Sequence, residues 1–195
     1  MSNRLQQTSA SICTMTALAF ACVPLVSLGC NTAPKAESRA TFALEAQAAQ
    51  QWFDTNVTGV GAQIKGAAGY IVFPDVGQFG IIFGGGTFGR GAVYDKTGTQ
   101  VGWAAINRAS IGLQLGVQGF KMLMVLQDDK TVADFKEGAW RGDVAATAVA
   151  ANSGAAASAQ FKEGVAVYVG DQAGLMAGMS IALAHVRYKN LNDVE

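Results

Sequence analysis

The residues of this chain that most suggest chemistry are three glycines in the stretch IIFGGGTFGRGAVY, at 81–94. Gly84, Gly86 and Gly89 follow the spacing GxGxxG directly after an apolar run, which is the fingerprint of a dinucleotide-binding turn. That turn needs a helix after the glycines, because the amides at the helix N-terminus hold the pyrophosphate. The residues that follow here, RGAVYD, indicate a strand. We therefore predict no nucleotide site and expect these glycines to belong to strands.

Side chains that usually perform catalysis or bind metals are sparse. His185 is the only histidine, so a Ser-His-Asp arrangement has a single available base, and no serine lies in a GxSxG elbow. A lone histidine in a strand pattern is usually structural, and the cysteine spacing of a zinc site is absent. Asp128 and Asp129 form the only adjacent acidic pair, in front of an expected helix. We predict no catalytic residue, no metal, no cofactor and no enzymatic activity.

The first thirty residues differ from the rest of the chain. Residues 11–28 are apolar or small, and Arg4 is the only charged residue before Lys35. A cationic start, an apolar stretch and a small residue before the cut are typical of a secretory signal peptide. The alternative is an uncleaved membrane anchor, because about 18 apolar residues can just span a bilayer. Pro24 and the small residues near the cut favour cleavage.

Cys30 follows this stretch directly, in the sequence VSLGC. That sequence resembles a bacterial lipobox, in which the cysteine is acylated and becomes the new N-terminus, although Ser27 and Leu28 are swapped relative to the usual order. LAFAC, which ends at Cys22, is a second candidate, but cleavage there would leave an apolar segment where a polar tether is expected. We predict a signal peptide at 1–29 and a lipid such as palmitate on Cys30.

The mature chain of 166 residues (195 − 29) contains no other cysteine, so no internal disulfide is expected in an oxidising compartment. The residue after Cys30 is Asn31 and not the Asp that usually retains a lipoprotein in the inner membrane. We therefore expect an outer-membrane lipoprotein that faces the periplasm. The formal net charge of the chain is zero, which gives no indication of a nucleic-acid partner. Membrane lipid is the expected partner, and the sequence specifies no protein partner.

Residues 30–37 read as the lipidated cysteine and a short tether, and residues 38–55 as an amphipathic helix rich in Ala, Gln and Glu. Its aromatic side chains fall on one face at steps of three and four residues. This face either packs on a sheet or enters a bilayer beside two basic residues, and the pattern leaves both open. The candidate lipid contacts are Lys35, Arg39, Phe42, Trp52 and Phe53.

From about residue 69 the pattern changes to short β-rich runs separated by glycine or polar clusters, with a hairpin turn at 95–98. Pro74 is expected to end the first strand. A later helix is expected to be capped by Thr131 and to end at Gly138. Many short strands and few helices indicate an α+β fold. Its sheet is expected to be mostly antiparallel, glycine-rich and curled towards a barrel.

Glycines recur at even spacing in these runs, which places them on one face of a strand and lets another segment lie close. The stretches AAGYIVFPDVGQFGIIFGGGTFGRGAVY, ASIGLQLGVQ and GLMAGMS resemble the SYLF domain family. The resemblance covers about residues 50–190, within a domain that we assign to residues 38–190. The matching residues are Gly69, Tyr70, Phe73, Pro74, Gly84, Gly85, Gly89, Gly91, Ser110, Gly112, Gln114, Gly116, Gln118, Trp140 and Gly142.

The resemblance implies a lipid-binding domain. Eukaryotic members of the family bind phosphoinositides, partly through an N-terminal amphipathic helix, and some bundle actin. Bacterial members are often secreted or anchored as lipoproteins. Members often carry a basic residue in the turn after the Phe-Pro pair, whereas this chain has Gln78 there and no lysine. An anionic-lipid contact is therefore not carried over to this loop.

These observations predict a non-enzymatic envelope lipoprotein with a lipid-binding domain. Cys30 would anchor the chain, and the helix at 38–55 and the glycine-rich sheet would form the apolar contact surface. The alternative is an anchored structural or protein-interaction module of the envelope without lipid binding of its own.

Overall fold

The computed structural model describes residues 32–81, 84–110, 116–138, 145–147, 149–150, 160–170, 180–182 and 186–193. The predictions on the signal peptide, Cys30 and His185 lie outside these residues. The helices are η1 (Ala36–Ser38), α1 (Arg39–Asn56), α2 (Val60–Gly66), α3 (Asp129–Lys136) and η3 (Leu191–Asp193). The strands are β1 (Gly69–Ile81), β2 (Gly84–Asp95), β3 (Gln100–Ser110), β4 (Gly116–Leu126), β5 (Ala145–Thr147), β6 (Val149–Ala150), β7 (Val165–Gly170), β8 (Ser180–Ala182) and β9 (Val186–Asn190).

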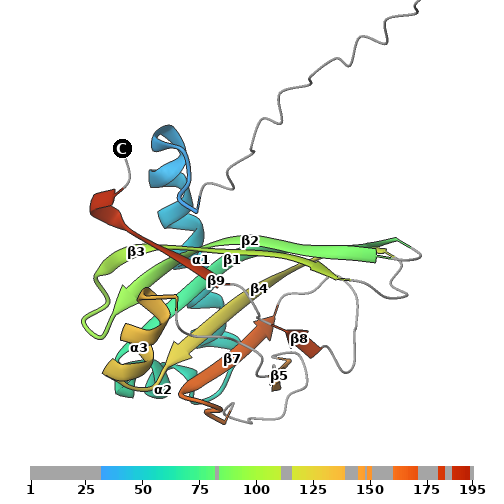
Figure 1. Ribbon diagram of the computed structural model, residues 1–195. Coiled ribbons are helices and arrows are strands. Elements are labelled where there is room, and N and C mark those ends of the chain that lie inside the picture. The colour runs from blue at the N-terminus through green and yellow to red at the C-terminus, as the bar shows by residue number, and fades with distance from the viewer. Residues whose placement is uncertain are drawn as a thin grey trace, which may run out of the picture.

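A central sheet of seven strands organises the molecule, in the order β6-β7-β4-β1-β2-β3-β9 (Figure 1). Neighbouring strands are antiparallel throughout, except for the parallel pair β6 and β7. The predicted α+β class and the mostly antiparallel sheet are therefore confirmed. Among the described strands the sheet keeps two edges, β6 and β9, so its closure into a barrel is not confirmed. β5 and β8 form a separate two-stranded sheet.

One face of the central sheet is covered by α1 and α2. Ala46, Ala49 and Phe53 of α1 are buried in a cluster with side chains of this face, because they recur at the helical period. In the same cluster Tyr70 and Tyr94 stack with ring centroids 4.9 Å apart, and burial raises the pKa of Tyr94 to about 12. The helix expected at 38–55 thus corresponds to α1, packed on the sheet.

The opposite face of the sheet forms a second core with α3. Phe135 of α3 is fully buried there among side chains that alternate with those of the first face, such as Ile71 and Val93. Burial on both faces explains the nearly continuous apolar run of β4, whose residues Met122–Leu126 are all buried. All described elements, and both cores, lie between Thr32 and Asp193, so a chain that begins at Asn31 keeps the whole described fold.

β1 passes through Pro74, so the prediction that this proline ends the strand is wrong. The pairing with β2 shifts between Val72 and Asp75, and the pairing with β4 shifts between Phe73 and Val76. In each case β1 carries one residue more than its neighbour, which is a β-bulge. Proline has no backbone N–H to donate to the ladder, and a bulge is one of the few places in a sheet that accepts it. Side chains after the bulge therefore change faces relative to a regular strand.

The turn and cap predictions have different outcomes. The turn at 95–98 joins β2 to β3, with Gly98 at φ 80°, as predicted. Gly138 also has a positive φ, 69°, directly after the last turn of α3. The predicted cap is wrong by three residues, because the side chain of Asp128, and not that of Thr131, accepts the hydrogen bond from a first-turn amide.

Candidate functional site

The aromatic candidates on α1 lie against the sheet. Phe53 is completely buried. Trp52 is half-buried, with its ring over Gly170 at the end of β7. Phe42 packs edge-on against Trp103, with ring centroids 5.6 Å apart. In this arrangement Phe53 is a core residue, and Phe42 and Trp52 retain partial access to solvent.

The basic candidates lie at the start of α1. Lys35 is exposed, and the guanidinium Nε of Arg39 donates a hydrogen bond to the backbone oxygen of Pro34 at 3.4 Å. Ala33, in the expected tether, is buried in the same cluster as Phe53. The segment just after Cys30 is thus tied to the folded body. Contact between lipid and any of the five candidates stays a prediction.

The glycines of the GxGxxG stretch lie in one strand. Gly84, Gly86 and Gly89 all belong to β2, which continues to Asp95. A dinucleotide-binding turn requires a helix N-terminus at this point, and β2 occupies it instead. The glycines therefore have a role within the sheet.

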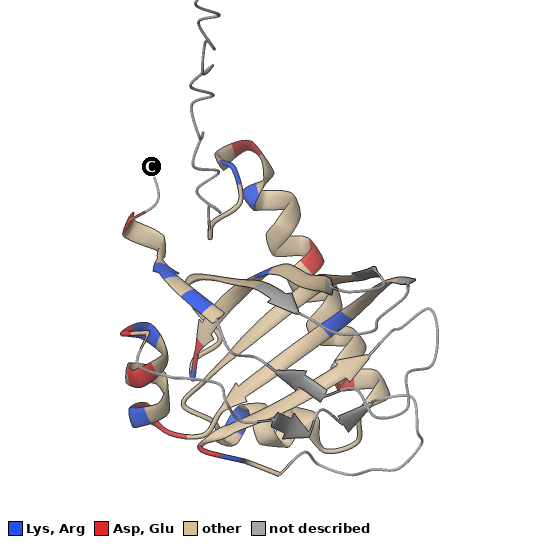
Figure 2. Ribbon diagram, turned by 45° about the vertical axis from the view of Figure 1, so that its right-hand side comes forward, with Lys and Arg blue, Asp and Glu red and all other residues tan. Residues whose placement is uncertain are grey.

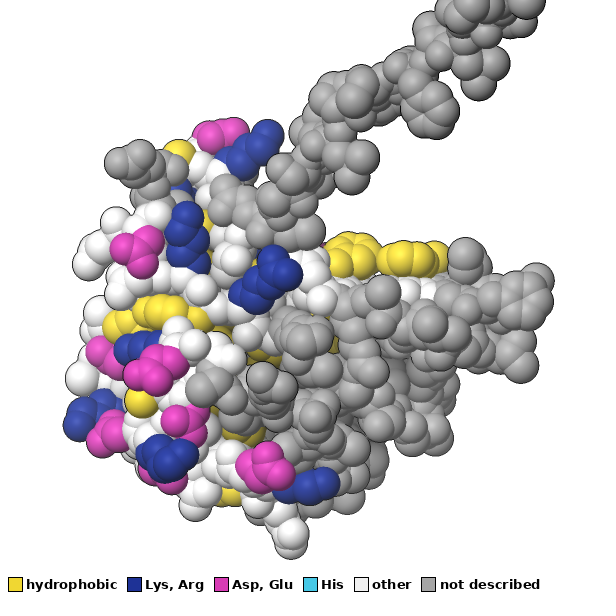
Figure 3. All heavy atoms as spheres, in the orientation of Figure 1, with side chains coloured by type: hydrophobic (Ala, Val, Ile, Leu, Met, Phe, Trp, Pro, Cys, Tyr) yellow, Lys and Arg dark blue, Asp and Glu magenta, His cyan; other side chains and the backbone are white. Residues whose placement is uncertain are grey.

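The sequence reasoning missed a surface on the side of the sheet that carries α1. Phe79, Phe88 and Val117, which we call the distal apolar face, have exposed fractions of 43%, 53% and 84%. Phe79 lies opposite Val117 of β4 and opposite Gly86 of β2. Phe88 lies opposite Gly77 of β1. Residues directly opposite each other point to the same face, so the three side chains share one face. Hydrophobic side chains project above the sheet at this end in Figure 3.

Glycine shapes this face. The ring of Phe88 occupies the space that a Cβ on Gly77 would need. The rings of Phe79 and Phe88 lie 6.4 Å apart between centroids and are tilted by 45°. The even spacing of glycines was a usable signal for close approach, but it did not show that the rings of Phe79 and Phe88 both stay exposed.

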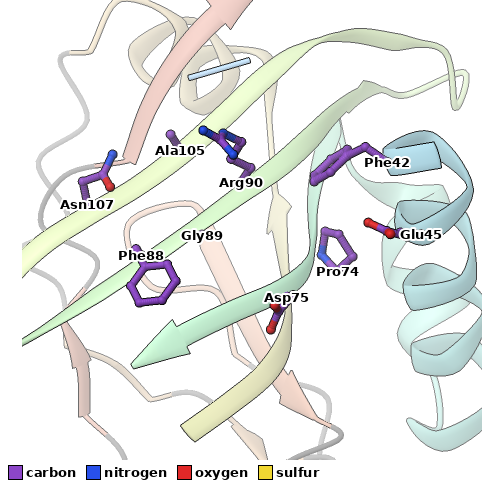
Figure 4. Close-up of a pocket in the computed structure, with 9 residues that line it drawn as sticks. All are labelled: Phe42, Glu45, Pro74, Asp75, Phe88, Gly89, Arg90, Ala105 and Asn107. Carbon is purple, nitrogen blue, oxygen red and sulfur yellow. The ribbon is translucent and has the colours of Figure 1, made fainter. Parts of the chain in front are cut away.

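A groove of about 350 Å³ joins the distal apolar face to α1. As Figure 4 shows, α1 contributes Phe42 and Glu45 to one wall, and strands β1 to β3 contribute the rest. Apolar rings and charged groups alternate along it, so the groove is amphipathic. It is lined by Phe42, Glu45, Pro74, Asp75, Phe88, Gly89, Arg90, Ala105 and Asn107.

Charged side chains form a row at the α1 end of the distal apolar face. Asp75 lies opposite Arg90, Arg90 opposite Ala105, and Ala105 opposite Arg187 of β9. We call these four residues the charged row. Lys189 lies two residues after Arg187 on β9, opposite Trp103. Figure 2 shows the basic positions on β9 and near the start of α1.

Within the described ranges, no group of three or more His, Cys, Asp or Glu side chains is arranged to hold a metal ion. The helices of the described part of the chain are all too short or too polar to cross a membrane. The described residues place an exposed apolar face, a charged row and a groove side by side on one face of the sheet.

Comparison with protein families gives a match between residues 107–192 and the family described as Ysc84, Las17-binding protein actin regulator. Comparisons with curated proteins and with solved structures give no match. The matched segment contains β4, α3 and the strands β5 to β9, together with the end of β3. It therefore confirms the resemblance to SYLF proteins for the C-terminal part of the fold. The match at residues 107–192 is consistent with a SYLF domain in this part of the chain.

Proposed function

We propose that this protein binds phospholipid membranes through the distal apolar face and is held at the membrane by a lipid on Cys30. The observation that carries the proposal is the exposure of Phe79, Phe88 and Val117 on one face of the sheet. Exposed apolar side chains that are grouped on one surface are typical of a site that contacts protein or membrane. Burial of apolar area stabilises the contact by about 25 cal/mol per Å². The proposal includes no catalysis and no cofactor.

The place of Ala33 supports an anchor that works together with this face. Ala33 is buried in the core on the α1 side of the sheet, which is the side that exposes the distal apolar face. Ala33 is the third residue after Cys30, so a lipid on Cys30 would be attached within about 10 Å of Ala33. Anchor and apolar face would then meet one bilayer together. More than one acyl chain on Cys30 would by itself make the attachment stable, and the apolar face would add a second contact with the same bilayer.

The family match supports lipid binding and also provides the alternative function. The SYLF resemblance implies lipid binding, whereas the matched family is described as a Las17-binding actin regulator. The second description favours a protein partner. The alternative function is therefore an anchored protein-interaction module of the envelope that uses the same exposed face.

Vesicle co-sedimentation of residues 31–195 separates the two functions. We expect binding to phosphatidylcholine vesicles, and we expect the double change Phe88→Ser and Val117→Ser to weaken it by about tenfold or more, because apolar area is lost from the contact. Leu44→Ser is the matched control, since Leu44 is 66% exposed but lies on α1 outside this face. Failure to bind any vesicle, with a folded protein, would rule out lipid binding by the domain and favour the protein module.

The anchor is tested in cells on the full chain. We expect incorporation of labelled palmitate and recovery in the outer-membrane fraction, and we expect Cys30→Ala to abolish the label. Asn31→Asp should move the labelled protein to the inner membrane. Label that persists in Cys30→Ala would contradict the assignment of Cys30, and the Cys22→Ala variant then tests the second candidate cysteine.

A further inference from the structure

We propose that the groove beside α1 selects a zwitterionic phospholipid with a primary ammonium, as in phosphatidylethanolamine. The inference rests on the lipid binding proposed above and adds the class of headgroup. It is drawn from the order of charges along the charged row and from the position of that row beside the distal apolar face.

Along the charged row, the negative group lies at one end and the positive groups follow it. Asp75 of β1 is at one end, and Arg90 and Arg187 flank the small side chain of Ala105. Directly opposite residues have Cβ atoms about 5 Å apart, so the Cβ atoms of Arg90 and Arg187 lie about 10 Å apart across Ala105. Ala105 is buried at the floor of the groove, so a phosphate in the groove between Arg90 and Arg187 is within reach of both arginine side chains.

The α1 wall adds a second carboxylate at the negative end. Glu45 lines the groove on the side of Pro74 and Asp75, and its side chain points from α1 towards Pro74 (Figure 4). The amide of Asn107 lies in the groove at the opposite end, on β3. The groove lining holds two carboxylates and the guanidinium of Arg90, and Arg187 on β9 beside the groove brings the formal charge of the four groups to zero. The carboxylates of Glu45 and Asp75 would repel a purely anionic headgroup, and the arginines would repel a purely cationic one.

Hydrogen bonding favours a primary ammonium over choline. A primary ammonium donates three N–H groups, which the carboxylates of Glu45 and Asp75 can accept. A choline group has no N–H to donate. The planar guanidinium fork matches the phosphate oxygens of either lipid. The two carboxylates therefore favour phosphatidylethanolamine over phosphatidylcholine, because only phosphatidylethanolamine has an ammonium that donates hydrogen bonds.

The apolar part of the lipid has a place on the same face. Along β2, Arg90 is followed on this face by Phe88 and then by Gly86, which lies opposite Phe79. Four residues of strand span about 13 Å. A headgroup at the charged row would thus place the start of its acyl chains over Phe88 and Phe79.

Co-sedimentation with three kinds of vesicle tests the inference on residues 31–195. The vesicles are phosphatidylcholine alone, and phosphatidylcholine mixed equally with phosphatidylethanolamine or with phosphatidylglycerol. We expect the phosphatidylethanolamine mixture to bind about tenfold more tightly than either of the others, the factor expected from a charge-assisted hydrogen bond.

A charge-reversal variant decides whether the groove causes this preference, since phosphatidylethanolamine also changes how tightly lipids pack. We expect Glu45→Lys to abolish the preference for phosphatidylethanolamine and to favour phosphatidylglycerol. Glu137→Lys is the matched control: it makes the same change of charge at the end of α3, on the opposite face of the sheet. It should keep the wild-type preference.

The other results overturn the inference in distinguishable ways. Equal binding to all three vesicles, or an unchanged preference in Glu45→Lys, would overturn headgroup selection and leave the proposed lipid binding intact. Tighter binding of wild type to phosphatidylglycerol would overturn it in favour of an anionic lipid. No binding to any vesicle would remove the proposed function itself. A dimer that dissociates in Phe88→Ser, without vesicle binding, would identify a second copy of the chain as the occupant.

Discussion

At the scale of single residues, glycine in this protein makes room for aromatic rings. A Cβ on Gly91 would lie 2.9 Å from the ring of Phe73, and the ring of Trp52 occupies the space beside Gly170. Carbon atoms pack best about 3.5–4.0 Å apart, so any larger residue at either position must displace a ring. Glycine at these two positions is therefore a packing requirement of the sheet.

Gly170→Ala tests this requirement. We expect it to lower the free energy of unfolding by about 1–3 kcal/mol, because the added methyl group overpacks the contact with Trp52. Gly66→Ala is the control, since a Cβ there meets no atom within 4 Å, and it should change stability by less than about 1 kcal/mol. Both are measured by urea denaturation. Equal effects of the two changes would show that Trp52 does not constrain Gly170.

Asp128 has a local role at the start of α3. Its carboxylate accepts hydrogen bonds from the amide and the hydroxyl of Thr131, each at 2.8 Å. These bonds, the one from the amide first, hold the pKa of Asp128 below its ordinary value of 3.8. A carboxyl group with a lower pKa in the folded state stabilises the fold above its unfolded pKa, and this stabilisation is lost as the pH falls through the folded pKa.

Asp128→Ala should therefore lower the melting temperature by a few degrees at neutral pH. The difference from wild type should shrink as the pH falls below 3.8. Asp128→Asn should retain part of the stability at neutral pH, because asparagine also caps helices. Thermal melts at a series of pH values measure all three proteins. A difference that does not depend on pH would show that the carboxylate charge has no part in the cap.

At the scale of elements, α1 is a packing helix with one face in the core. Phe53→Ala should lower the free energy of unfolding by about 3–5 kcal/mol, because it leaves a cavity under the helix. Leu44→Ala, on the exposed side of α1, should change it by less than about 0.5 kcal/mol. Denaturant titration gives both values. Similar small effects would mean that α1 leaves the sheet easily, and would support its entry into a bilayer.

The elements also show which features the sequence could predict. The periodicity of residues 38–55 located α1 because helical spacing is a local property. Asp128 and Thr131 are both good caps, so the choice between them depended on geometry that a sequence does not contain. Pro74 normally ends a strand, and only the pairing with both neighbours shows the bulge that accepts it. The exposure of Phe79 and Phe88 depends on where α1 stops covering the sheet, and this too is a property of the assembled fold.

At the scale of the whole molecule, charge balance limits how the protein meets a membrane. Residues 31–195 carry 13 basic residues (14 less Arg4) and 14 acidic ones, a formal charge of −1. Such a chain has no general attraction to an anionic surface. Membrane binding should then come from apolar contact, with charge acting only at the groove.

Binding of residues 31–195 to phosphatidylcholine vesicles should accordingly change less than about twofold between 0.1 M and 1 M salt, although the Debye length falls from about 10 Å to 3 Å. Co-sedimentation at the two salt concentrations measures this. Binding that disappears at high salt would contradict an apolar contact, and would make Lys35, Arg39 and Lys189 the next positions to change.

The bulge at Pro74 also constrains how this chain can evolve. The side chains of β1 from Asp75 to Phe79 face the side that they do because one extra residue is present. Deletion of that residue would reverse the faces of the side chains that follow it in β1. Phe79 would then turn towards the α3 core and Val76 towards solvent, although no amino acid is replaced. Homologous chains should therefore tolerate substitutions between Val72 and Val76 more readily than insertions or deletions. In this segment, the number of residues determines which side chains face solvent and which face the core.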